Sequence, residues 1–407
     1  MDGLIKLVIV FILIVVALRR KLFVGYTLFA AGLLTALLFG SSVGDILTGY
    51  KNVLISATFL RLLAIIVMIT FLGRLLREIG YLDRLVVASR ELVGGARVAA
   101  MALPLLVGLM PMPGGALMSA PLVARVLGKD EYPAAFAAAV NYWSRHVIEF
   151  IWPVYPGIIL AAAITGIPIG HISLMNVPMT LLMLALGYLF LIRKIRNGPG
   201  SRKHFWKPFL GIISAVWPIL LAISLYAVFP IDLLVAIVIS ILFLMIAGKP
   251  DRKALKAVVR EAFSPRLLAL VFGILSFQKM LEVSQAISSI PAFAASVGLS
   301  AGPVIVIVAF ISGLLTGMLA ALVGLSFPLL AEYLYRPEVN YPAIFLAFLS
   351  GYIGMILSPT HFCLILSNEY FKADLVRVYK IIVLPIILLF LAGLLLYVMA
   401  YPDMVLG

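Results

Sequence analysis

The chain has 407 residues, of which 64% are hydrophobic and 12% are charged. Soluble domains are about 45–50% apolar and about 25% charged, so this composition excludes a soluble enzyme and a nucleic-acid-binding protein. The net charge of +14 is better explained by basic cytoplasmic loops beside a membrane than by a nucleic-acid partner. There is one cysteine, Cys363, which excludes an intrachain disulfide.

Apolar stretches follow one another along the whole chain, and many are long enough to cross about 30 Å of hydrocarbon. The first is followed by Arg19 and is expected to be an uncleaved membrane helix. We predict an all-α polytopic membrane protein of the cytoplasmic (inner) membrane, surrounded by membrane lipid. The apolar stretches are residues 3–18, 22–40, 52–73, 98–127, 133–167, 172–192, 209–228, 231–248, 266–284, 301–334, 341–370 and 376–400.

Two stretches are interrupted at their centres by residues that break helices. Residues 111–115 of the stretch 98–127 read Pro-Met-Pro-Gly-Gly, and Thr316-Gly317 lies near the middle of 301–334. Proline lacks an amide donor and glycine frees the backbone, so a straight helix is not expected at the first interruption. The half-helices on either side are too short to span the bilayer. We predict a re-entrant helical hairpin in each stretch.

Two further stretches are long and carry an interruption away from their ends. In 133–167 the sequence Trp-Pro-Val-Tyr-Pro occupies residues 152–156, and in 341–370 the sequence Ser-Pro-Thr-His occupies residues 358–361. We predict that both stretches form discontinuous transmembrane helices.

The basic residues support this topology independently. With both hairpins returning to the side they enter from, cytoplasmic loops hold 25 of the 31 Lys and Arg residues, and outer loops hold only Lys51 and Arg336. A hairpin that crossed the membrane would invert every later loop and remove the asymmetry. The prediction is about ten full crossings plus two hairpins, with both termini on the non-cytoplasmic side.

The two halves of the chain share an order of elements and short matching strings. Residues 119–123 resemble 326–330, residues 132–136 resemble 341–345, and Pro153 corresponds to Pro359, all about 207 residues apart. Each half makes an odd number of crossings, so the second is expected to be inverted. Inverted repeats with broken helices are an architecture of secondary transporters. The predicted units are a first repeat (1–195), a cytoplasmic linker (196–208) and a second repeat (209–407).

The tip of the first hairpin is a candidate binding site for an anion. Pro113, Gly114 and Gly115 allow a ligand to approach the main chain, and Ser119 adds a hydroxyl group. Free amides at the start of the second half-helix, together with the helix dipole, attract negative charge. The alternative is that these residues only build the turn. Thr316 and Gly317 are the corresponding candidates at the second tip.

The two helix breaks supply further polar candidates. Ser358, Pro359, Thr360 and His361 lie in the middle of an apolar stretch, and Tyr155 with Pro153 holds the corresponding place in the first repeat. Ser and Thr also cap helices, which is the structural alternative. His361 is a candidate for ion coupling because imidazole titrates near neutral pH.

A third group is charged. Asn141, Arg145 and Glu149 are spaced by four residues and are expected to share one helix face, with His146 beside it. Either Arg145 and Glu149 form a structural ion pair, or Arg145 binds an anionic substrate while Glu149 or His146 couples transport to an ion. Arg61 is expected to pair with Glu149 or to help hold substrate.

Two inverted repeats, each with a hairpin followed by a broken helix, resemble the ion transporter superfamily. The strings at 111–115, 141–149 and 358–363 are most similar to its branch catalogued as domain of unknown function 401. The resemblance implies that hairpin tips and helix breaks form the substrate and ion sites, that one domain moves as an elevator, and that the protein is a homodimer. The Ser-Asn-Thr signature of sodium-coupled dicarboxylate carriers is absent from both hairpins, which leaves the coupling ion open.

The expected function is secondary active transport of a small organic anion, with a carboxylate as the expected class, coupled to a proton or sodium gradient. The alternative is a cation/proton antiporter of the same fold that exchanges ions at Glu149. An enzyme is not expected, because the sequence has no nucleophile motif and no phosphate-binding loop. No metal site and no cofactor beyond H⁺ or Na⁺ are expected either, because the four histidines are scattered.

Overall fold

The computed structural model describes residues 2–91, 95–109, 115–128, 131–196, 206–229 and 231–400. Within these ranges every regular element is a helix, and no strand occurs. The helices are α1 (Asp2–Arg19), α2 (Val24–Leu38), α3 (Val43–Ile55), α4 (Ala57–Glu78), α5 (Tyr81–Glu91), α6 (Ala96–Gly108), α7 (Gly115–Leu127), α8 (Ala134–His146), α9 (Pro156–Thr165), α10 (Ile169–Met175), α11 (Val177–Phe190), η1 (Ile192–Lys194), α12 (Trp206–Ala227), α13 (Leu233–Gly248), α14 (Arg252–Ala262), α15 (Pro265–Val283), η2 (Ala286–Ser288), α16 (Ser289–Ser296), α17 (Ala301–Thr316), α18 (Leu319–Leu329), α19 (Ala331–Leu334), α20 (Tyr341–Leu357), α21 (Phe362–Phe371) and α22 (Leu375–Ala400).

Several helices have the length and composition of membrane spans. Among the described residues, five are long and apolar enough to cross a bilayer, and the number rises to seven if each of two bent helix pairs counts as one span. The chain is therefore an all-helical protein of the kind expected in a membrane. The five are Ala57–Glu78, Val177–Lys194, Phe209–Ala227, Tyr341–Phe371 and Leu375–Met399.

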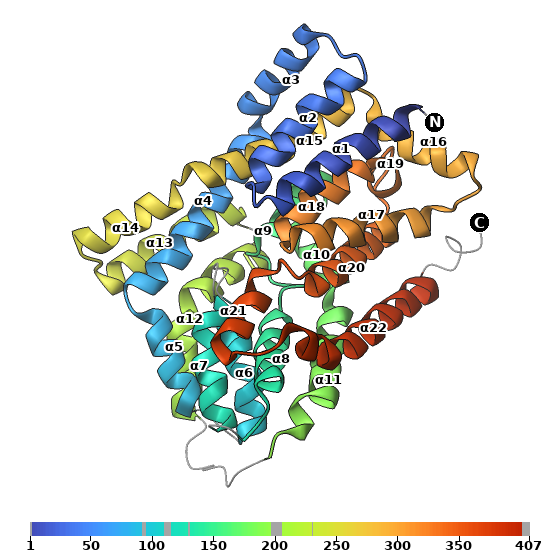
Figure 1. The fold of residues 1–407 in the computed structure, drawn as a ribbon. Coiled ribbons are helices and arrows are strands. Elements are labelled where there is room, and N and C mark those ends of the chain that lie inside the picture. Colours follow the sequence, from blue (N-terminus) through green and yellow to red (C-terminus); the bar gives the residue numbers. More distant parts are fainter. Residues whose placement is uncertain are drawn as a thin grey trace.

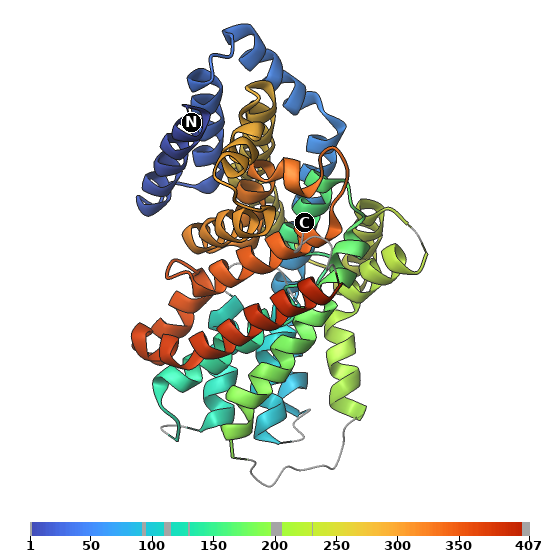
Figure 2. The ribbon, with the colours of Figure 1, turned by 90° about the vertical axis from the view of Figure 1, so that its right-hand side faces the viewer.

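The helices form two groups with a layer between them. α1, α2, α3 and α15 lie at one end of the molecule, and α5 to α8, α11 and α12 lie at the other (Figure 1). α9, α18 and α20 lie between the two groups. α22 crosses the middle of the molecule in both views (Figures 1 and 2). The chain thus brings the helices at the predicted interruptions to its centre.

The second predicted interruption lies in the described part of the chain, where α17 ends at Thr316 and α18 begins at Leu319. α6 and α7 pack against each other, as do α17 and α18. α6 and α7 have 13 residues each, which corresponds to about 20 Å and is shorter than the hydrocarbon core. Pro113 and Gly114, at the predicted first tip, lie outside the described residues, as does most of the linker 196–208.

Both broken helices also occur. α8 ends at His146 and α9 begins at Pro156, and α20 ends at Leu357 before α21 begins at Phe362. The contacts of these helices correspond between the two halves. α6 packs on α8 and α17 packs on α20, while α7 packs on α21 and α18 packs on α9. Each hairpin therefore contacts the broken helix of its own half and that of the other half.

Two tyrosines hold the broken helices together reciprocally. The hydroxyl of Tyr142 in α8 donates to the carbonyl of Ile356 near the end of α20, at 2.8 Å. The hydroxyl of Tyr352 in α20 donates to the carbonyl of His146 at the end of α8, at 2.6 Å. Carbonyls in the last turn of a helix lack intrahelical partners. Each broken helix thus supplies a hydrogen-bond donor to the end of the other.

Glycines let certain helices approach closely. A Cβ atom on Gly313 of α17 would collide with the carbonyl oxygen of Gly351 in α20, and one on Gly354 would collide with that of Phe310. A similar contact joins Gly25 of α2 to α15. Close backbone packing at small residues is typical of helix pairs in membranes, where burial alone does not drive association.

The ion pair predicted for Arg61 is wrong. Its guanidinium pairs with the carboxylate of Asp232, which also caps α13, and the Arg61 side chain is 65% exposed. The sequence suggested Glu149 or the substrate as partner, because Arg61 stands in an apolar stretch and Asp232 is 171 residues away. Arg61 instead links α4 to the start of α13.

Candidate functional site

The candidate site is built around the end of α8. Every residue from Ala135 to His146 is buried, so this helix is enclosed by others on all sides. Val147 to Tyr155 form turns, and α9 begins with Pro156 in its first turn. Proline suits the start of a helix because the missing N–H group would have no intrahelical partner there. The break therefore gathers polar groups within the protein interior.

Arg145 lies where the first hairpin meets this break. It is 4% exposed. A Cβ atom on Gly115, the first residue of α7, would stand 2.7 Å from its Nη2 atom. The hydroxyl of Tyr155 hydrogen bonds to the guanidinium and also donates to the carbonyl of Gly108, at 2.7 Å. Both arms of the hairpin thus contact the residues that surround the buried cation.

Asn141 connects three helices one turn before Arg145. Its Nδ2 atom donates to the carbonyl of Ala116 in α7 at 3.1 Å and to the Oγ atom of Ser367 in α21 at 2.9 Å. The hydroxyl of Ser119 donates to the carbonyls of Gly115 and Ala116, both at 3.3 Å. Ser119 is therefore directed back along its own helix.

The second hairpin tip contacts the second break. Gly317 has a φ of +59°, a conformation that favours glycine. A Cβ atom there would stand 2.9 Å from the backbone nitrogen of His361 and 3.1 Å from Ser358 Oγ. Ser358 donates to the carbonyl of Leu314 at 2.7 Å. Ser358 thus fixes α17 to the break before α21.

Three further predicted site residues belong to the second tip and the second break, namely Thr316, Pro359 and Thr360. The Thr316 hydroxyl donates to the Ser312 carbonyl at 2.8 Å, within its own helix. The Thr360 hydroxyl and Ser358 Oγ lie 2.8 Å apart. Pro359 and Thr360 are exposed, and Pro153 of the first break is partly buried.

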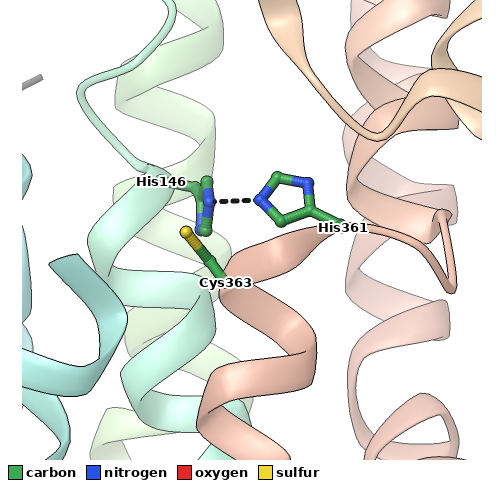
Figure 3. A group of neighbouring side chains, drawn as sticks. All are labelled: His146, His361 and Cys363. Carbon is green, nitrogen blue, oxygen red and sulfur yellow. Dashed lines mark hydrogen bonds between the residues drawn. The ribbon is translucent and has the colours of Figure 1, made fainter. Parts of the chain in front are cut away.

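His146 and His361, 215 residues apart in the sequence, face each other where the two breaks meet. Their Nε2 atoms lie 3.0 Å apart. The Nδ1 atom of His146 lies 2.6 Å from the carbonyl oxygen of Tyr142, and that of His361 lies 3.2 Å from the carbonyl oxygen of Met355. Figure 3 shows the sulfur of Cys363 beside the His146 ring. Both imidazoles are buried.

Glu149 completes this group from the turn after α8. Because α8 ends at His146, Glu149 does not continue the helix face of Asn141 and Arg145, and that part of the sequence prediction is wrong. Its carboxylate Oε2 atom lies 3.8 Å from Nε2 of His146. The residue is 8% exposed, and Oε2 makes no hydrogen bond within the described part of the chain.

Comparison with known proteins identifies the family. The family model described as "Protein of unknown function (DUF401)" matches residues 3–400. The chain belongs to the DUF401 family. No curated protein matches it. The predicted resemblance to domain of unknown function 401 is therefore confirmed, whereas membership of the ion transporter superfamily stays a prediction.

In this DUF401 member the fold gathers one subset of the predicted residues, namely Gly115, Asn141, Arg145, His146, Glu149, Tyr155 and His361. A second subset surrounds the second tip, namely Thr316, Gly317, Ser358 and Thr360. Which of them bind substrate or ion stays a prediction.

The sequence analysis assigned Cys363 no functional role and took the four histidines to be scattered. The spacing His361-Phe362-Cys363 at a helix break was an available signal, because a break lets both side chains turn toward one point. The approach of His146 depends on how α8 and α20 cross, which no local pattern in the sequence encodes.

Proposed function

We propose that this protein is a secondary active transporter of a small organic anion, of the carboxylate class, which works by elevator-type alternating access. The observation that carries the proposal is Arg145, a buried cation placed between the first hairpin and the first helix break. A buried charge is costly inside a membrane unless it is paired or serves a substrate. The guanidinium would attract an anion at this point.

The start of α7 adds to the attraction for an anion. Gly115 and Ala116 form the first turn of this helix and are both buried. The first-turn amides of a helix have no intrahelical acceptors, and the helix dipole is positive at this end. Arg145 and these amides approach the same point from two helices, which suits the two oxygens of a carboxylate.

The arrangement of helices supports an inverted-repeat carrier of the ion transporter superfamily type. The matching contacts of α6–α8 with α17–α20, and of α7–α21 with α18–α9, are those expected of two related halves. The reciprocal bonds of Tyr142 and Tyr352 follow the same relation. We include in the proposal about ten crossings, two re-entrant hairpins and a homodimer.

The proposed orientation places both termini outside the cytoplasm in the inner membrane. The first residues of α1 and the end of α22 lie on one side of the molecule, while α14 and α5 lie toward the opposite side (Figure 1). α14 contains Arg252, Lys253, Lys256 and Arg260. Basic segments are typical of the cytoplasmic side. Uptake is proposed to draw on a proton or sodium gradient.

Counterflow in proteoliposomes tests the function. Vesicles loaded with one unlabelled mono- or dicarboxylate receive the same labelled anion outside, and exchange is measured with Arg145→Gln and with Arg61→Gln as control. Loss of hydrogen bonds to a charged group costs about 1.5–3 kcal/mol, so Arg145→Gln is expected to weaken anion binding by about 10–100-fold. Arg61→Gln removes only an exposed pair and is expected to leave exchange intact.

Two results would contradict the proposal. If none of the anions exchanges, and alkali cations instead collapse an imposed pH gradient, the protein is an antiporter and not an anion carrier. If anions exchange equally well with Arg145→Gln, Arg145 does not contact substrate.

A further inference from the structure

We propose that His146, His361 and Cys363 form a binding site for a divalent transition-metal ion of the zinc class, with Glu149 as the fourth ligand. The inference goes beyond the proposed function, because binding of a metal at this site does not require that any anion is carried. Each of the four side chains comes from one of the two helix breaks or the residues next to it.

The ligand atoms of His146, His361 and Cys363 are already close together, whereas the position of Glu149 is fixed only by its contact with His146. One ligand atom each from His146, His361 and Cys363 lies within 4.8 Å of the others. Zinc binds imidazole nitrogen at about 2.0–2.1 Å in tetrahedral geometry, which places two such nitrogens about 3.3 Å apart. The Nε2 atoms lie 3.0 Å apart. A shift of a few tenths of an ångström would therefore admit the ion.

The hydrogen bonds of the two rings fix which nitrogen is free. A carbonyl oxygen only accepts, so the Nδ1 atoms that face Tyr142 and Met355 carry the hydrogens. In neutral imidazole the other nitrogen, Nε2, then has a lone pair and no hydrogen. With the two Nε2 atoms 3.0 Å apart, two such lone pairs need a cation to share, either a proton or a metal ion. Metal-binding histidines usually donate their second N–H group to a carbonyl or carboxylate in this way.

Glu149 gives an independent indication of a missing ligand. Its Oε2 atom is buried, makes no hydrogen bond within the described residues, and lies 3.8 Å from Nε2 of His146. Arg145 attracts this carboxylate electrostatically, but a buried oxygen without a hydrogen-bond partner is still costly. A metal ion shared with the imidazoles would supply that partner.

The donor set selects the kind of ion. Two imidazole nitrogens, a thiolate sulfur and a carboxylate oxygen suit zinc and related transition metals. Magnesium and calcium prefer oxygen ligands and are not expected to bind here. The thiolate and the carboxylate would balance a divalent charge.

The site would also join the two halves of the fold. His146 ends α8, and Cys363 lies in the first turn of α21, one residue after its start. A bound ion would therefore link the first broken helix to the second. Binding is expected to raise the unfolding temperature of the protein, since a ligand that binds only the folded state stabilises it.

The test uses the full-length protein, purified in detergent without a histidine tag and stripped with a chelator. It is titrated with zinc chloride and, separately, with cobalt chloride. We expect one equivalent of metal by elemental analysis, a rise in unfolding temperature with zinc, and a thiolate-to-cobalt charge-transfer band. Cys363→Ser is expected to lose that band, and His361→Gln to weaken binding at least tenfold. His171→Gln, an exposed histidine of α10, is the matched control and is expected to change neither.

The proposal is overturned if zinc does not bind saturably at micromolar concentration, or if His361→Gln, Cys363→Ser and His171→Gln all bind as the unaltered protein does. Glu149→Gln, which keeps the shape of the side chain, is a second variant. If it binds zinc with undiminished affinity, Glu149 is not a ligand. No anion is present in these measurements. Failure of anion exchange and failure of metal binding are therefore separate results.

Discussion

The side chains around Arg145 explain why a glycine begins α7. The guanidinium lies 2.7 Å from the place where a Cβ atom of Gly115 would stand, and it hydrogen bonds with the Tyr155 hydroxyl. A larger residue at 115 would displace the charged group without disturbing any backbone. The guanidinium of Arg145 can therefore take this position only because residue 115 has no Cβ atom.

Gly115→Ala is expected to reduce anion exchange at least tenfold while the protein stays folded. The new Cβ atom would lie 2.7 Å from Nη2 and 2.9 Å from Nε of Arg145, and a flexible guanidinium moves more easily than a helix. Exchange and unfolding temperature are measured side by side. Gly170→Ala is the control, because nothing lies within 4 Å of a Cβ atom there. Full exchange in the Gly115 variant would separate Arg145 from substrate binding.

At this scale the sequence predicted residue types better than it predicted partners. Arg145, Tyr155, His146 and His361 were identified from polar groups in apolar stretches. The partner proposed for Arg61 was wrong because pairing across 171 residues depends on how α4 meets α13. The prediction that Glu149 shares a helix face with Asn141 and Arg145 was wrong because it assumed that α8 continued past His146.

Among the elements, the two broken helices depend on each other. Each leaves carbonyls without intrahelical partners at its break, and each receives a tyrosine hydroxyl from the other. A break of this kind is stable only where neighbouring helices satisfy the backbone. The breaks at 152–156 and 358–361 could be read from proline in the sequence, whereas their mutual capping could not.

Tyr142→Phe is expected to lower the free energy of unfolding by about 1–3 kcal/mol, because it removes the side-chain donor from the buried carbonyl of Ile356. Tyr352→Phe is expected to lower it by about 0.5–1.5 kcal/mol, because the carbonyl of His146 keeps the N–H group of Glu149 as a donor. Both tyrosines are fully enclosed, and phenylalanine keeps their volume. Thermal unfolding in detergent measures the effect. Tyr188→Phe, at an exposed tyrosine of α11, serves as the comparison. Equal stability of all three variants would mean that the breaks do not need these bonds.

The close contact of α17 with α20 leads to a second prediction at this scale. Gly313→Ala is expected to destabilise the protein by about 1–3 kcal/mol or more, as overpacking in a core does, because the methyl group would meet the carbonyl of Gly351. The control is Gly302→Ala, near the start of the same helix, because a Cβ atom there has no neighbour within 4 Å. If both variants unfold at the same temperature, α17 and α20 can separate without cost.

One short element was not predicted although the end of the helix before it was. The predicted stretch 133–167 ends near the end of α9, just before Gly166, but the chain then turns by 113° into α10, which was not separated from the predicted stretch 172–192. Gly166 has a φ of +75° and Pro168 follows it. A glycine and then a proline after a helix is a recognised end signal.

For the whole molecule, composition and apolar patterning predicted an all-helical membrane protein, and the structure agrees on that coarse point. Five to seven helices meet the length and composition of a span, fewer than the ten crossings predicted. The difference arises because some predicted spans, such as α2 and α13, are helices of only 15 and 16 residues. Length alone does not decide whether such a helix crosses.

The topology rests on whether the first hairpin returns to the side it came from, and labelling of single cysteines decides this. Cys363→Ser first removes the one native cysteine, and Lys51→Cys, Glu131→Cys or Lys256→Cys is then introduced, each at an exposed position. Intact cells are treated with a membrane-impermeant maleimide before and after permeabilisation. We expect Lys51→Cys to react from outside, and Glu131→Cys and Lys256→Cys to react only after permeabilisation, because α6 and α7 are each about 20 Å long and too short to cross. Reaction of Glu131→Cys from outside, with Lys256→Cys still protected, would show that the segment 98–127 crosses the membrane. The cytoplasmic assignment of the loop after α7 would then fail, and with it the inverted relation between the two halves.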